Sequence, residues 1–493
     1  MTTPMLEFLW RGDLVALPHI APTRTLLQLL REDLGHSATK EGCNEGDCGA
    51  CTVVLGERRG DHVKYSAVNG CIRLAHSIHG MALWTAADLA SPDGTPHPVQ
   101  QALHQCHASQ CGFCTPGFAM SLFGVYQNHV LNNEPVTRTL AQEALSGNLC
   151  RCTGYRPILD AAQQMAELPR VYPDETKLLQ QLELIAHTRS RLETNYSYIS
   201  PNNLGALLAA RAAQPAAQLI AGCTDVGLWV NKLHMDFAQV LDVTRVTELK
   251  TIEVLDKHTV IGAAVSLTDA FAALQVDRPQ LQAFFSRFAG LPVRNSGTLG
   301  GNVANGSPIG DSMPLLIALR ASVVLMSVRG ARELPLENLY TGYRKNVMAA
   351  DEVLAYVRVP RPEPDELLRV YKVSKRFEDD ISAVCLAIHL QRQGGQASRA
   401  SIGVGGVAAT PVRAVKTEAA LCGQAWARDT LAQAIGTLRN EFQPISDMRA
   451  SAAYRSEVLG NLLERFWLES QGQSNTSIES IHLASLDMEG ENA

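Results

Sequence analysis

The sequence lacks the features that mark membrane, secreted and nucleic-acid-binding proteins. No apolar run reaches the roughly 18 residues that a membrane-spanning helix needs. Near the N-terminus, Glu7, Arg11 and Asp13 interrupt any apolar stretch that could serve as a secretory signal. The 43 basic and 49 acidic residues are intermixed, so no basic surface for nucleic acid is expected. We therefore expect a cytoplasmic protein that binds neither a membrane nor nucleic acid.

Two further absences concern the fold. No internal repeat is present, and 493 residues are too many for a single core, so three or four domains are expected. The glycine-rich segments do not have the form G-x-G-x-x-G after a strand, so they are not a Rossmann fingerprint. The chain is thus expected to contain several different domains.

The twelve cysteines are the most informative residues that are present. Disulfides are not expected in a long chain without a secretion signal. Three cysteines with the spacing C-x4-C-x2-C, followed by a fourth, form the first group: Cys43, Cys48, Cys51 and Cys71. This is the plant-type ferredoxin spacing for a [2Fe–2S] cluster. A four-cysteine zinc site is the alternative, but zinc usually pairs its cysteines as two C-x2-C knuckles.

A second group combines one C-x2-C pair with one C-x-C pair: Cys111, Cys114, Cys150 and Cys152. Each pair lies in a glycine-containing loop before a predicted helix that begins with proline, Pro116 or Pro157. Two such loops can bring four thiolates to one metal centre. The other cysteines are scattered, namely Cys106, Cys223, Cys385 and Cys422. Cys106 lies in a helical run rather than in a loop and is not expected to bind metal.

Composition and periodicity divide the chain into successive regions. Residues 1–81 show strand patterns with one helical run, and residues 82–168 show four helical runs. Residues 169–196 are polar and predict a linker with a helix through 177–187, or else an ordinary surface helix of a neighbouring domain. The later regions are 197–360, 361–475 and a tail, 476–493, whose composition predicts disorder.

Glycine-rich segments follow in the third region. An apolar strand at 218–222 leads into residues 223–226, and glycine recurs through 295–302 and 304–311. Such loops can turn successive backbone amides toward a pyrophosphate. Glycine-rich turns that merely join strands would give the same pattern. The residues alone leave both interpretations open.

These motifs together resemble the xanthine dehydrogenase family of molybdenum hydroxylases. The strings that carry the resemblance are EGC to GAC at 41–51, CGFCTPG at 111–117, NLCRCTGYRP at 148–157, AGCTDVG at 221–227 and GTLGGN to SPIGD at 297–311. The resemblance implies an α+β multidomain protein with four parts. These are a β-grasp [2Fe–2S] ferredoxin domain, a helical-bundle [2Fe–2S] domain, an α+β FAD-binding domain of the vanillyl-alcohol-oxidase/molybdenum-hydroxylase type, and an α+β C-terminal flavoprotein domain.

The resemblance also implies which residues contact FAD. The expected pyrophosphate stretch is Leu219, Ile220, Ala221, Gly222, Cys223, Thr224, Asp225 and Val226. The expected second phosphate loop is Thr298, Leu299, Gly300, Gly301 and Asn302. Phe288, Leu354 and Lys372 would contact the flavin, and Asp311 would accept hydrogen bonds from FAD hydroxyls. Cys223 and Asn305 stand where relatives vary, so the resemblance gives them no role of their own.

The function implied is that of the small iron–sulfur/FAD subunit of a split xanthine dehydrogenase. A separate large subunit would hold the molybdenum cofactor and bind the purine, in an α2β2 heterotetramer. Electrons would pass from molybdenum to the Cys111 group, then to the Cys43 group, then to FAD and NAD⁺. Two alternatives stay open: a subunit of another molybdenum hydroxylase acting on aldehydes or N-heterocycles, and a zinc-stabilised scaffold with a vestigial flavin fold.

The expected acceptor site lies in the stretch 372–380. By resemblance, Asp379 and Tyr343 lie where relatives meet the nicotinamide nucleotide. Phe377 stands where some relatives carry arginine, and a solvated charged turn is the alternative interpretation. A carboxylate near the flavin disfavours its anionic reduced form, which favours NAD⁺ over oxygen as acceptor.

Overall fold

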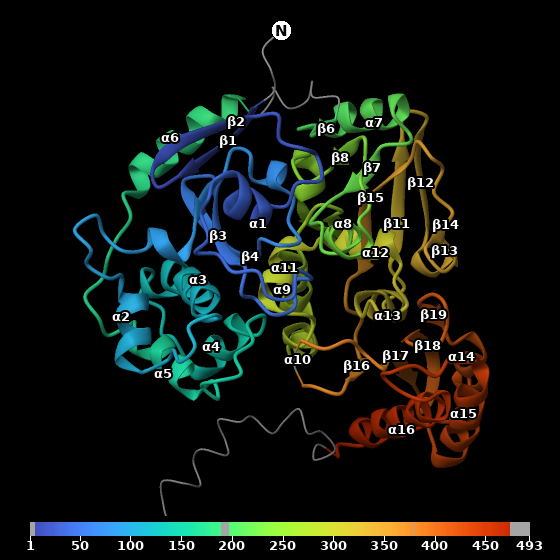
Figure 1. Cartoon of the computed structure of the whole chain (residues 1–493). Helices are drawn as coiled ribbons and strands as arrows, with labels where there is room; N and C mark the ends of the chain where they lie inside the picture. Colours follow the sequence, from blue (N-terminus) through green and yellow to red (C-terminus); the bar gives the residue numbers. More distant parts are fainter. Residues whose placement is uncertain (1–4, 189–196, 378, 474–493) are drawn as a thin grey trace, which may run out of the picture. The chain divides into compact units, whose positions relative to one another are not determined.

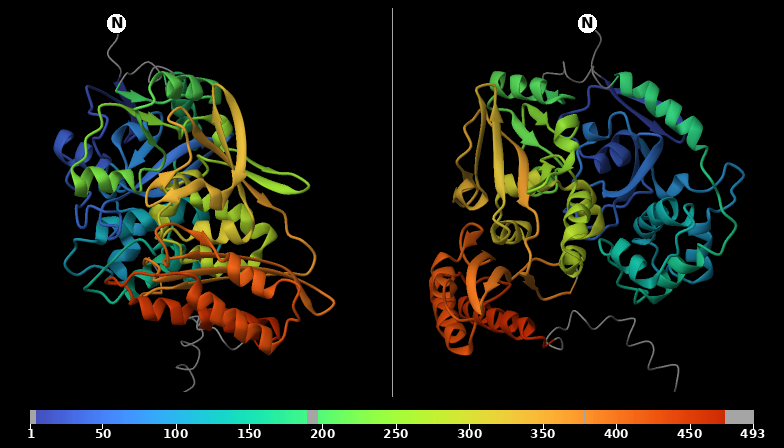
Figure 2. Two further views of the ribbon diagram at one scale, coloured as in Figure 1. Left: turned by 90° about the vertical axis from the view of Figure 1, so that its right-hand side faces the viewer. Right: turned by 180° about the vertical axis from the view of Figure 1, so that it is seen from behind.

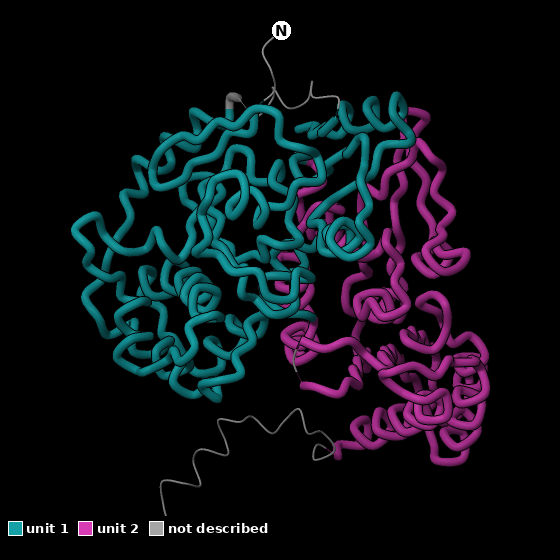
Figure 3. The backbone as a smooth tube through the Cα atoms, viewed as in Figure 1, with its two compact units in different colours: residues 1–247, 266–268, 289–298 teal, residues 248–265, 269–288, 299–493 magenta. Residues whose placement is uncertain are grey.

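The computed structural model describes residues 5–188, 197–377 and 379–473. It contains two compact units (Figure 1; Figure 3). Unit 1 comprises residues 1–247, 266–268 and 289–298, and unit 2 comprises residues 248–265, 269–288 and 299–493. The predicted disordered tail and residues 189–196 of the predicted linker lie outside the described residues.

The N-terminal part of unit 1 is a mixed five-stranded sheet. Along the sheet the strands are β2 (Asp13–Pro18), β1 (Met5–Trp10), β5 (Ala82–Trp84), β3 (Thr52–Arg59) and β4 (His62–Asn69). Only β1 and β5 pair in parallel among the described strands of this sheet. Helix α1 (Leu26–Gln28) continues as a π-helical turn, Leu29–Asp33, and its buried leucines share a core with Leu6 and Phe8. This arrangement is the predicted β-grasp.

Four helices follow in unit 1, as the periodicity predicted. They are α2 (Pro98–Gln105), α3 (Thr115–Val125, extended by a π-helical turn, Tyr126–Val130), α4 (Arg138–Ala144) and α5 (Arg156–Gln164). Phe118, Leu122 and Tyr126 of the long central helix are almost fully buried. Their core extends to buried side chains of the ferredoxin sheet, such as Val54.

The predicted helix after this bundle is α6 (Glu175–Thr188), and it packs on the ferredoxin sheet. Leu178, Leu182 and Ile185 are buried in the same core as the bundle. The Glu175 carboxylate accepts a 3.0 Å hydrogen bond from the backbone N–H of Val63. The segment therefore contributes to the core of unit 1.

A small parallel sheet completes unit 1. Its elements are β6 (Tyr198–Ile199), α7 (Leu204–Ala213), β7 (Gln218–Ile220), α8 (Val226–Leu233), β8 (Val240–Asp242) and, from a later segment, α11 (Leu291–Ser296). The strand order is β6-β8-β7. The Tyr198 hydroxyl donates a 2.7 Å hydrogen bond to the buried Asp242, which ties the first and last strands together.

Unit 2 begins with an antiparallel five-stranded sheet. Its strands, in order, are β12 (Gly330–Pro335), β11 (Ser322–Ser327), β15 (Val353–Pro360), β10 (His258–Gly262) and β9 (Ile252–Val254). The remaining elements of this part are α9 (Leu267–Asp277, which starts in unit 1), α10 (Gln282–Ser286), α12 (Leu299–Asn305), α13 (Ser312–Ala318), β13 (Tyr340–Gly342) and β14 (Lys345–Asn346).

The C-terminal part of unit 2 is a four-stranded antiparallel sheet with helices packed against it (Figure 2). Its elements are β16 (Glu366–Val373), β17 (Val384–Gln393), β18 (Gln396–Gly405), β19 (Val412–Arg413), α14 (Val415–Leu421), α15 (Arg428–Glu441) and α16 (Ala452–Ser470). The two predicted amphipathic helices correspond to α15 and α16. Among the described helices, none combines the length and apolarity needed to cross a bilayer.

Candidate iron–sulfur and flavin sites

Three thiols of the first cysteine group lie in the loop between the π-helical turn and β3, and the fourth, Cys71, follows β4. The backbone N–H groups of Cys43 and Cys48 each donate to the other residue's sulfur, at 3.3 Å. The Cys43 thiol also interacts with the thiols of Cys48 and Cys71, and the Cys71 thiol with that of Cys51. The interaction with the thiols of Cys48 and Cys71 lowers the pKa of the Cys43 thiol. The interaction with Cys43 is also the main reason why the pKa of the Cys48 thiol is raised, and burial raises it further.

This loop has the properties of an iron–sulfur loop. Backbone N–H groups point at sulfur, as the one from Glu45 to the Cys43 sulfur at 3.4 Å also does. Such donors favour the thiolate ligands that hold a cluster. Within the described part of the chain, no three His, Cys, Asp or Glu side chains are grouped as a single metal ion needs. The four thiols and their backbone donors fit a [2Fe–2S] cluster.

The second group lies at the starts of α3 and α5. The thiol of Cys111 interacts with that of Cys152, and the thiol of Cys114 with that of Cys150, so each thiol of the C-x2-C pair lies near one of the C-x-C pair. Burial, with the hydrogen bond to Cys150, raises the pKa of the Cys114 thiol to about 12. Burial opposes ionisation of Cys150, but donors of Thr153, led by its hydroxyl at 3.2 Å, lower the pKa of its thiol. This donor set also fits a cluster.

Cys106 lies apart from both groups. It is the C-terminal cap residue of α2, and its thiol donates a 2.7 Å hydrogen bond to the side-chain carbonyl of Gln164. Its thiol thus links α2 to α5.

The two thiol loops contact each other directly. The backbone N–H of Leu149 donates to the Cys48 carbonyl at 3.0 Å. This bond joins a cysteine of the first group to the residue before Cys150 of the second group. The Asn148 amide donates to the Gly49 carbonyl at 3.1 Å, and it accepts a 2.6 Å hydrogen bond from the Ser121 hydroxyl. A Cβ on Gly49 would lie 2.1 Å from the carbonyl oxygen of Gly147, so only glycine fits there.

Sequence reasoning assigned no role to Asn148 or Ser121. Asn148 is part of the motif before Cys150, but a motif does not reveal that its amide contacts a loop almost a hundred residues earlier. Both side chains are buried, at 3% and 2% exposure, so their hydrogen bonds hold the contact without solvent.

The expected pyrophosphate stretch lies in unit 1, at the end of β7 and the start of α8. Gly222 packs so closely on α11 that a Cβ there would lie 1.7 Å from the Ser296 carbonyl oxygen. Cys223 has a left-handed backbone (φ 60°) and is buried beside Leu74 and Tyr198. Burial, with the nearby Asp242 carboxylate, raises the pKa of the Cys223 thiol to about 12, so the thiol stays neutral.

The expected second phosphate loop, residues 298–302, is not a continuous loop in the structure. Thr298 is buried and ends the segment of unit 1, whereas Leu299–Asn302 form the first turn of α12 in unit 2 rather than a loop. The helix forms because Leu299 and Val303, four residues apart, are both fully buried on one face. Sequence reasoning gave the glycines more weight than this apolar spacing.

The other expected flavin residues lie in unit 2. Asp311 and Lys372 form a buried ion pair at 3.0 Å, and the Ser382 hydroxyl donates to both Asp311 oxygens at 2.6 and 2.7 Å. A carboxylate has about four acceptor sites, so Asp311 retains capacity for a further donor such as a hydroxyl. Phe288 packs edge-on against Phe271, with ring centroids 5.0 Å apart.

Comparison with known proteins identifies the domains. Four domain families match in sequence order: 2Fe-2S iron-sulfur cluster binding domain at 12–72, [2Fe-2S] binding domain at 85–163, FAD binding domain in molybdopterin dehydrogenase at 194–362, and CO dehydrogenase flavoprotein C-terminal domain at 369–470. The chain is 31% identical to xanthine dehydrogenase of Drosophila subobscura over 94% of its length, and 32% identical to xanthine dehydrogenase 1 of Arabidopsis thaliana over 92%. The chain is the iron–sulfur and FAD region of a molybdenum hydroxylase.

Solved structures agree with this assignment. A carbon monoxide dehydrogenase from Hydrogenophaga pseudoflava superposes with a TM-score of 0.52 at 27% identity, over 55% of this chain and 95% of that chain. Quinoline 2-oxidoreductase from Pseudomonas putida 86 superposes with a TM-score of 0.51 at 26% identity, over 56% and 97%. The chain spans 39% of the length of the two xanthine dehydrogenases. The predicted α+β multidomain fold of this iron–sulfur/FAD region is confirmed.

The expected acceptor residues of the iron–sulfur/FAD region both lie in unit 2. Arg287 holds the loop that contains Asp379: its Nε donates to the Phe377 carbonyl at 2.9 Å, and its guanidinium lies 4.5 Å from the Phe377 ring centroid. Arg376 donates to the Asp379 carbonyl at 2.9 Å. Tyr343, 58% exposed, lies in the turn between β13 and β14. A role for these residues toward NAD⁺ stays a prediction.

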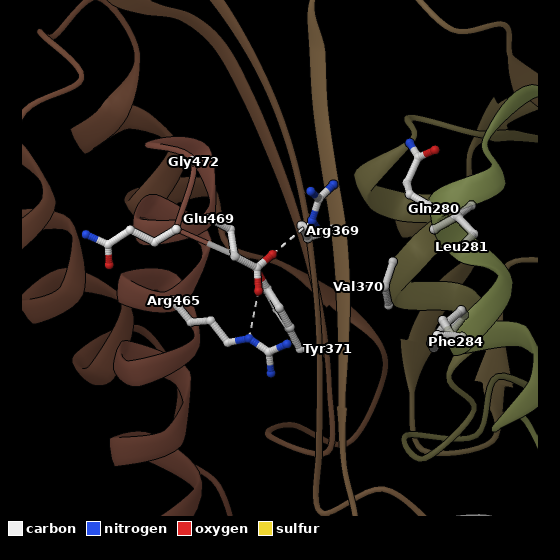
Figure 4. A pocket seen from close by; sticks show the side chains of 11 residues that line it. Gln280, Leu281, Phe284, Arg369, Val370, Tyr371, Arg465, Glu469 and Gly472 are labelled. Atoms are coloured by element: carbon white, nitrogen blue, oxygen red, sulfur yellow. Dashed lines mark hydrogen bonds and ion pairs between the residues drawn. The ribbon is translucent and has the colours of Figure 1, made fainter. Parts of the chain in front are cut away.

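A pocket of about 300 Å³ lies elsewhere in unit 2, between α10, β16 and the end of α16 (Figure 4). Glu469 accepts hydrogen bonds there from Arg369 at 2.9 Å and from Arg465 at 2.8 Å. None of the residues that line this pocket belongs to the predicted cofactor residues of the iron–sulfur/FAD region.

Proposed function

We propose that this chain is the electron-transfer subunit of a xanthine dehydrogenase. It passes electrons from hypoxanthine or xanthine oxidation, at a molybdenum cofactor on a separate large subunit, through two [2Fe–2S] clusters to FAD and NAD⁺. The observation that carries this proposal is the identity of 31–32% with xanthine dehydrogenases over 92–94% of the chain. The solved chains superpose over 55–56% of this chain and over 95–97% of their own length.

The helical domain provides the surface where electrons arrive. Cys111 and Cys152 are exposed. Phe113 and Tyr155 next to them are large apolar side chains that are 49% and 39% exposed. Exposed apolar side chains beside functional groups favour a protein partner. This face therefore suits the large molybdenum subunit, in the α2β2 assembly that the resemblance implies.

The chain's own contacts connect the successive sites of unit 1. The hydrogen bond from Leu149 to the Cys48 carbonyl links the two thiol loops. Helix α8, which follows the pyrophosphate stretch, packs against Ile72, next to Cys71. When bound, the clusters carry electrons singly and FAD combines two of them for hydride transfer. The order of sites in unit 1 thus supports flow from the helical domain toward the flavin.

The first experiment isolates the whole complex from cells that express this chain. Co-purification of a large subunit that contains molybdenum, a native mass of an α2β2 assembly, and turnover of hypoxanthine and xanthine are expected. Broad absorbance at about 400–550 nm, where iron–sulfur and flavin bands fall, would exclude the zinc-stabilised scaffold. A complex that turns over quinoline or an aldehyde but no purine would instead support the second candidate, another molybdenum hydroxylase, which the quinoline 2-oxidoreductase match favours.

The second experiment uses the isolated chain. It should pass electrons from NADH to an artificial acceptor through FAD, yet leave hypoxanthine and xanthine unchanged, because those substrates require molybdenum. Purine turnover by the molybdenum-free chain would contradict the proposal.

The acceptor is tested in the assembled complex with Asp379→Ala. A carboxylate near the flavin disfavours the anionic reduced form, so its loss should lower NAD⁺ reduction while oxygen consumption holds or rises. Asp365→Ala is a control for the left-handed backbone, since Asp365 is an exposed aspartate of unit 2 with the same kind of backbone, whereas Asp379 is half-buried. Equal NAD⁺-dependent rates in the Asp379 variant and the parent would remove Asp379 from the site.

A further inference from the structure

Helix α8 rests on the loop that holds the first cysteine group. Gly227, in its first turn, lies so close that a Cβ there would be 2.3 Å from the Ile72 carbonyl oxygen. In its last turn, the Asn231 amide donates a 2.7 Å hydrogen bond to the carbonyl of Cys71. The next residue, Lys232, donates its ammonium to the carbonyl of Cys43, also at 2.7 Å. Two consecutive residues thus contact the backbone of two predicted cluster ligands.

The contact between α8 and this loop includes one ion pair. Asn231 also donates to the carbonyl and side-chain oxygens of Asn44, at 3.3 and 3.2 Å, which fixes the end of the helix on the loop. The Lys232 ammonium lies 3.4 Å from the Glu45 carboxylate, and the two side chains are 44% and 48% exposed. One cation and one anion therefore stand on the cluster-binding loop, with the cation on a ligand carbonyl.

These charges bear on electron transfer. A cluster held by four thiolates gains one negative charge on reduction, so its potential depends on nearby charges and hydrogen bonds. A cation stabilises the reduced form and an anion destabilises it. We infer that Lys232 tunes the Cys43 site for electron transfer by raising its reduction potential, and that Glu45 opposes it. The inference rests on the proposed function, because it takes the Cys43 group to hold a [2Fe–2S] cluster.

The same charges contribute little to folding. Exposed ion pairs are worth about 0–1 kcal/mol, so substitution of either side chain should leave the fold intact. Lys232 lies on α8, the helix that starts within the pyrophosphate stretch, and Glu45 lies on the ferredoxin loop, so their ion pair connects the two segments. A positioning residue at this point can set how readily the loop accepts an electron without touching the flavin.

The experiment is a redox titration of the full chain, with each cluster followed by its electron paramagnetic resonance signal. Lys232→Met should lower the reduced-to-oxidised ratio of the Cys43 site about threefold at fixed potential, which is about 30 mV at 59 mV per tenfold for one electron. Glu45→Gln should raise the reduced-to-oxidised ratio. Lys232→Arg, which keeps the positive charge, should leave the ratio at the parent value. Lys177→Met, which changes an exposed lysine on α6, is the control and should shift neither cluster.

The direction of each potential shift and its dependence on salt distinguish an electrostatic role of Lys232 from a structural one. The double variant Lys232→Met/Glu45→Gln should return toward the parent potential, and the shift should shrink at about 1 M salt, where screening acts within ~3 Å. The signal of the other cluster should not move. An unchanged potential in Lys232→Met, or shifts of the same sign in Lys232→Met and Glu45→Gln, would overturn the inference. Absence of both signals in the parent would instead contradict the proposed function.

Discussion

The two thiol loops differ most in their access to solvent. In the ferredoxin loop, Cys51 and Cys71 are 2% and 1% exposed. In the helical loop, Cys111 and Cys152 are exposed. A buried site is reached only through neighbouring protein groups, whereas an exposed one can receive an electron from a partner. Cys111 and Cys152 of the helical loop are therefore accessible at the surface of this chain, whereas Cys51 and Cys71 are not.

The loops also differ in how tightly their backbones are packed. Gly49 of the ferredoxin loop has a left-handed backbone (φ 69°) and lies directly on the helical loop. Gly112 of the helical loop also has a left-handed backbone (φ 83°), but nothing lies within 4 Å of a Cβ built there. The backbone is thus tightly packed at Gly49, where the two loops meet, and is open at Gly112.

The largest expected effect comes from Cys150→Ser. This change removes one thiolate of the helical set, so one of two electron paramagnetic resonance signals should disappear while the other persists. Cys106→Ser is the matched control, because its thiol lies in the same domain outside both sets. Survival of both signals in Cys150→Ser would show that the ligand assignment is wrong.

The next effect compares Gly49→Ala with Gly112→Ala. Both place a side chain in a left-handed conformation, which costs about 1–2 kcal/mol. Gly49→Ala also forces the loops apart, so we expect a total loss of about 3–5 kcal/mol in the free energy of unfolding. Denaturant unfolding of both variants measures the difference. Equal losses would mean that the contact between the loops does not hold them together.

A pH effect should be confined to the helical domain. The His97 imidazole caps α2 by accepting from the Val99 N–H at 3.2 Å, and burial lowers its pKa from 6.5 to about 4. The folded state therefore favours the neutral ring: its contribution is complete above pH 6.5 and is lost as the pH falls through 4. The loss should reach about 3 kcal/mol.

Hydrogen exchange in α2 as a function of pH measures this loss. His97→Asn keeps a good cap residue and should remove the dependence between pH 6.5 and 4. His104→Asn, at an exposed position of the same helix, should leave it unchanged. A dependence that persists in His97→Asn would assign it to another group.

The smallest effect is expected from Tyr155→Phe. The Tyr155 hydroxyl accepts a 3.0 Å hydrogen bond from the backbone N–H of Cys150. Its removal should cost about 1 kcal/mol and speed loss of iron from the helical site to a chelator, while the ferredoxin site is unaffected. Tyr172→Phe, at a tyrosine that is 62% exposed, is the control. Equal iron loss from both sites would argue against a local role.

Much of the fold could be predicted because it depends on local patterns. Cysteine spacing grouped thiols from two segments in each set, Cys43 to Cys51 with Cys71 and Cys111 to Cys114 with Cys150 to Cys152, and that these sets ligate clusters stays a prediction. Apolar periodicity predicted the helices at 429–441 and 450–468, which are α15 and α16. The resemblance supplied the domain order, which the four domain families confirm.

The missed residues depend on contacts between distant segments. Ser382 binds Asp311, 71 positions away, and Asn231 binds Cys71, 160 positions away. No spacing within either segment encodes such a partner. The prediction of a loop at Leu299–Asn302 was wrong for a different reason. The two adjacent glycines favoured a loop in the sequence, whereas in the structure the burial of Leu299 and Val303 on one face stabilises a helix.

Unit 1 is built from separate segments of the chain, which has a consequence for its synthesis on the ribosome. Its later segment, 289–298, packs on the iron–sulfur part: Asn295 donates to the Ala67 carbonyl at 3.0 Å, and Pro292 meets Gly147. The N-terminal domains are made first, yet their packing is incomplete until residues 248–298 have been added. That interval takes roughly 3–10 s at about 5–20 residues per second. During this interval a nascent chain would lack the contacts that residues 289–298 make with Ala67 and Gly147.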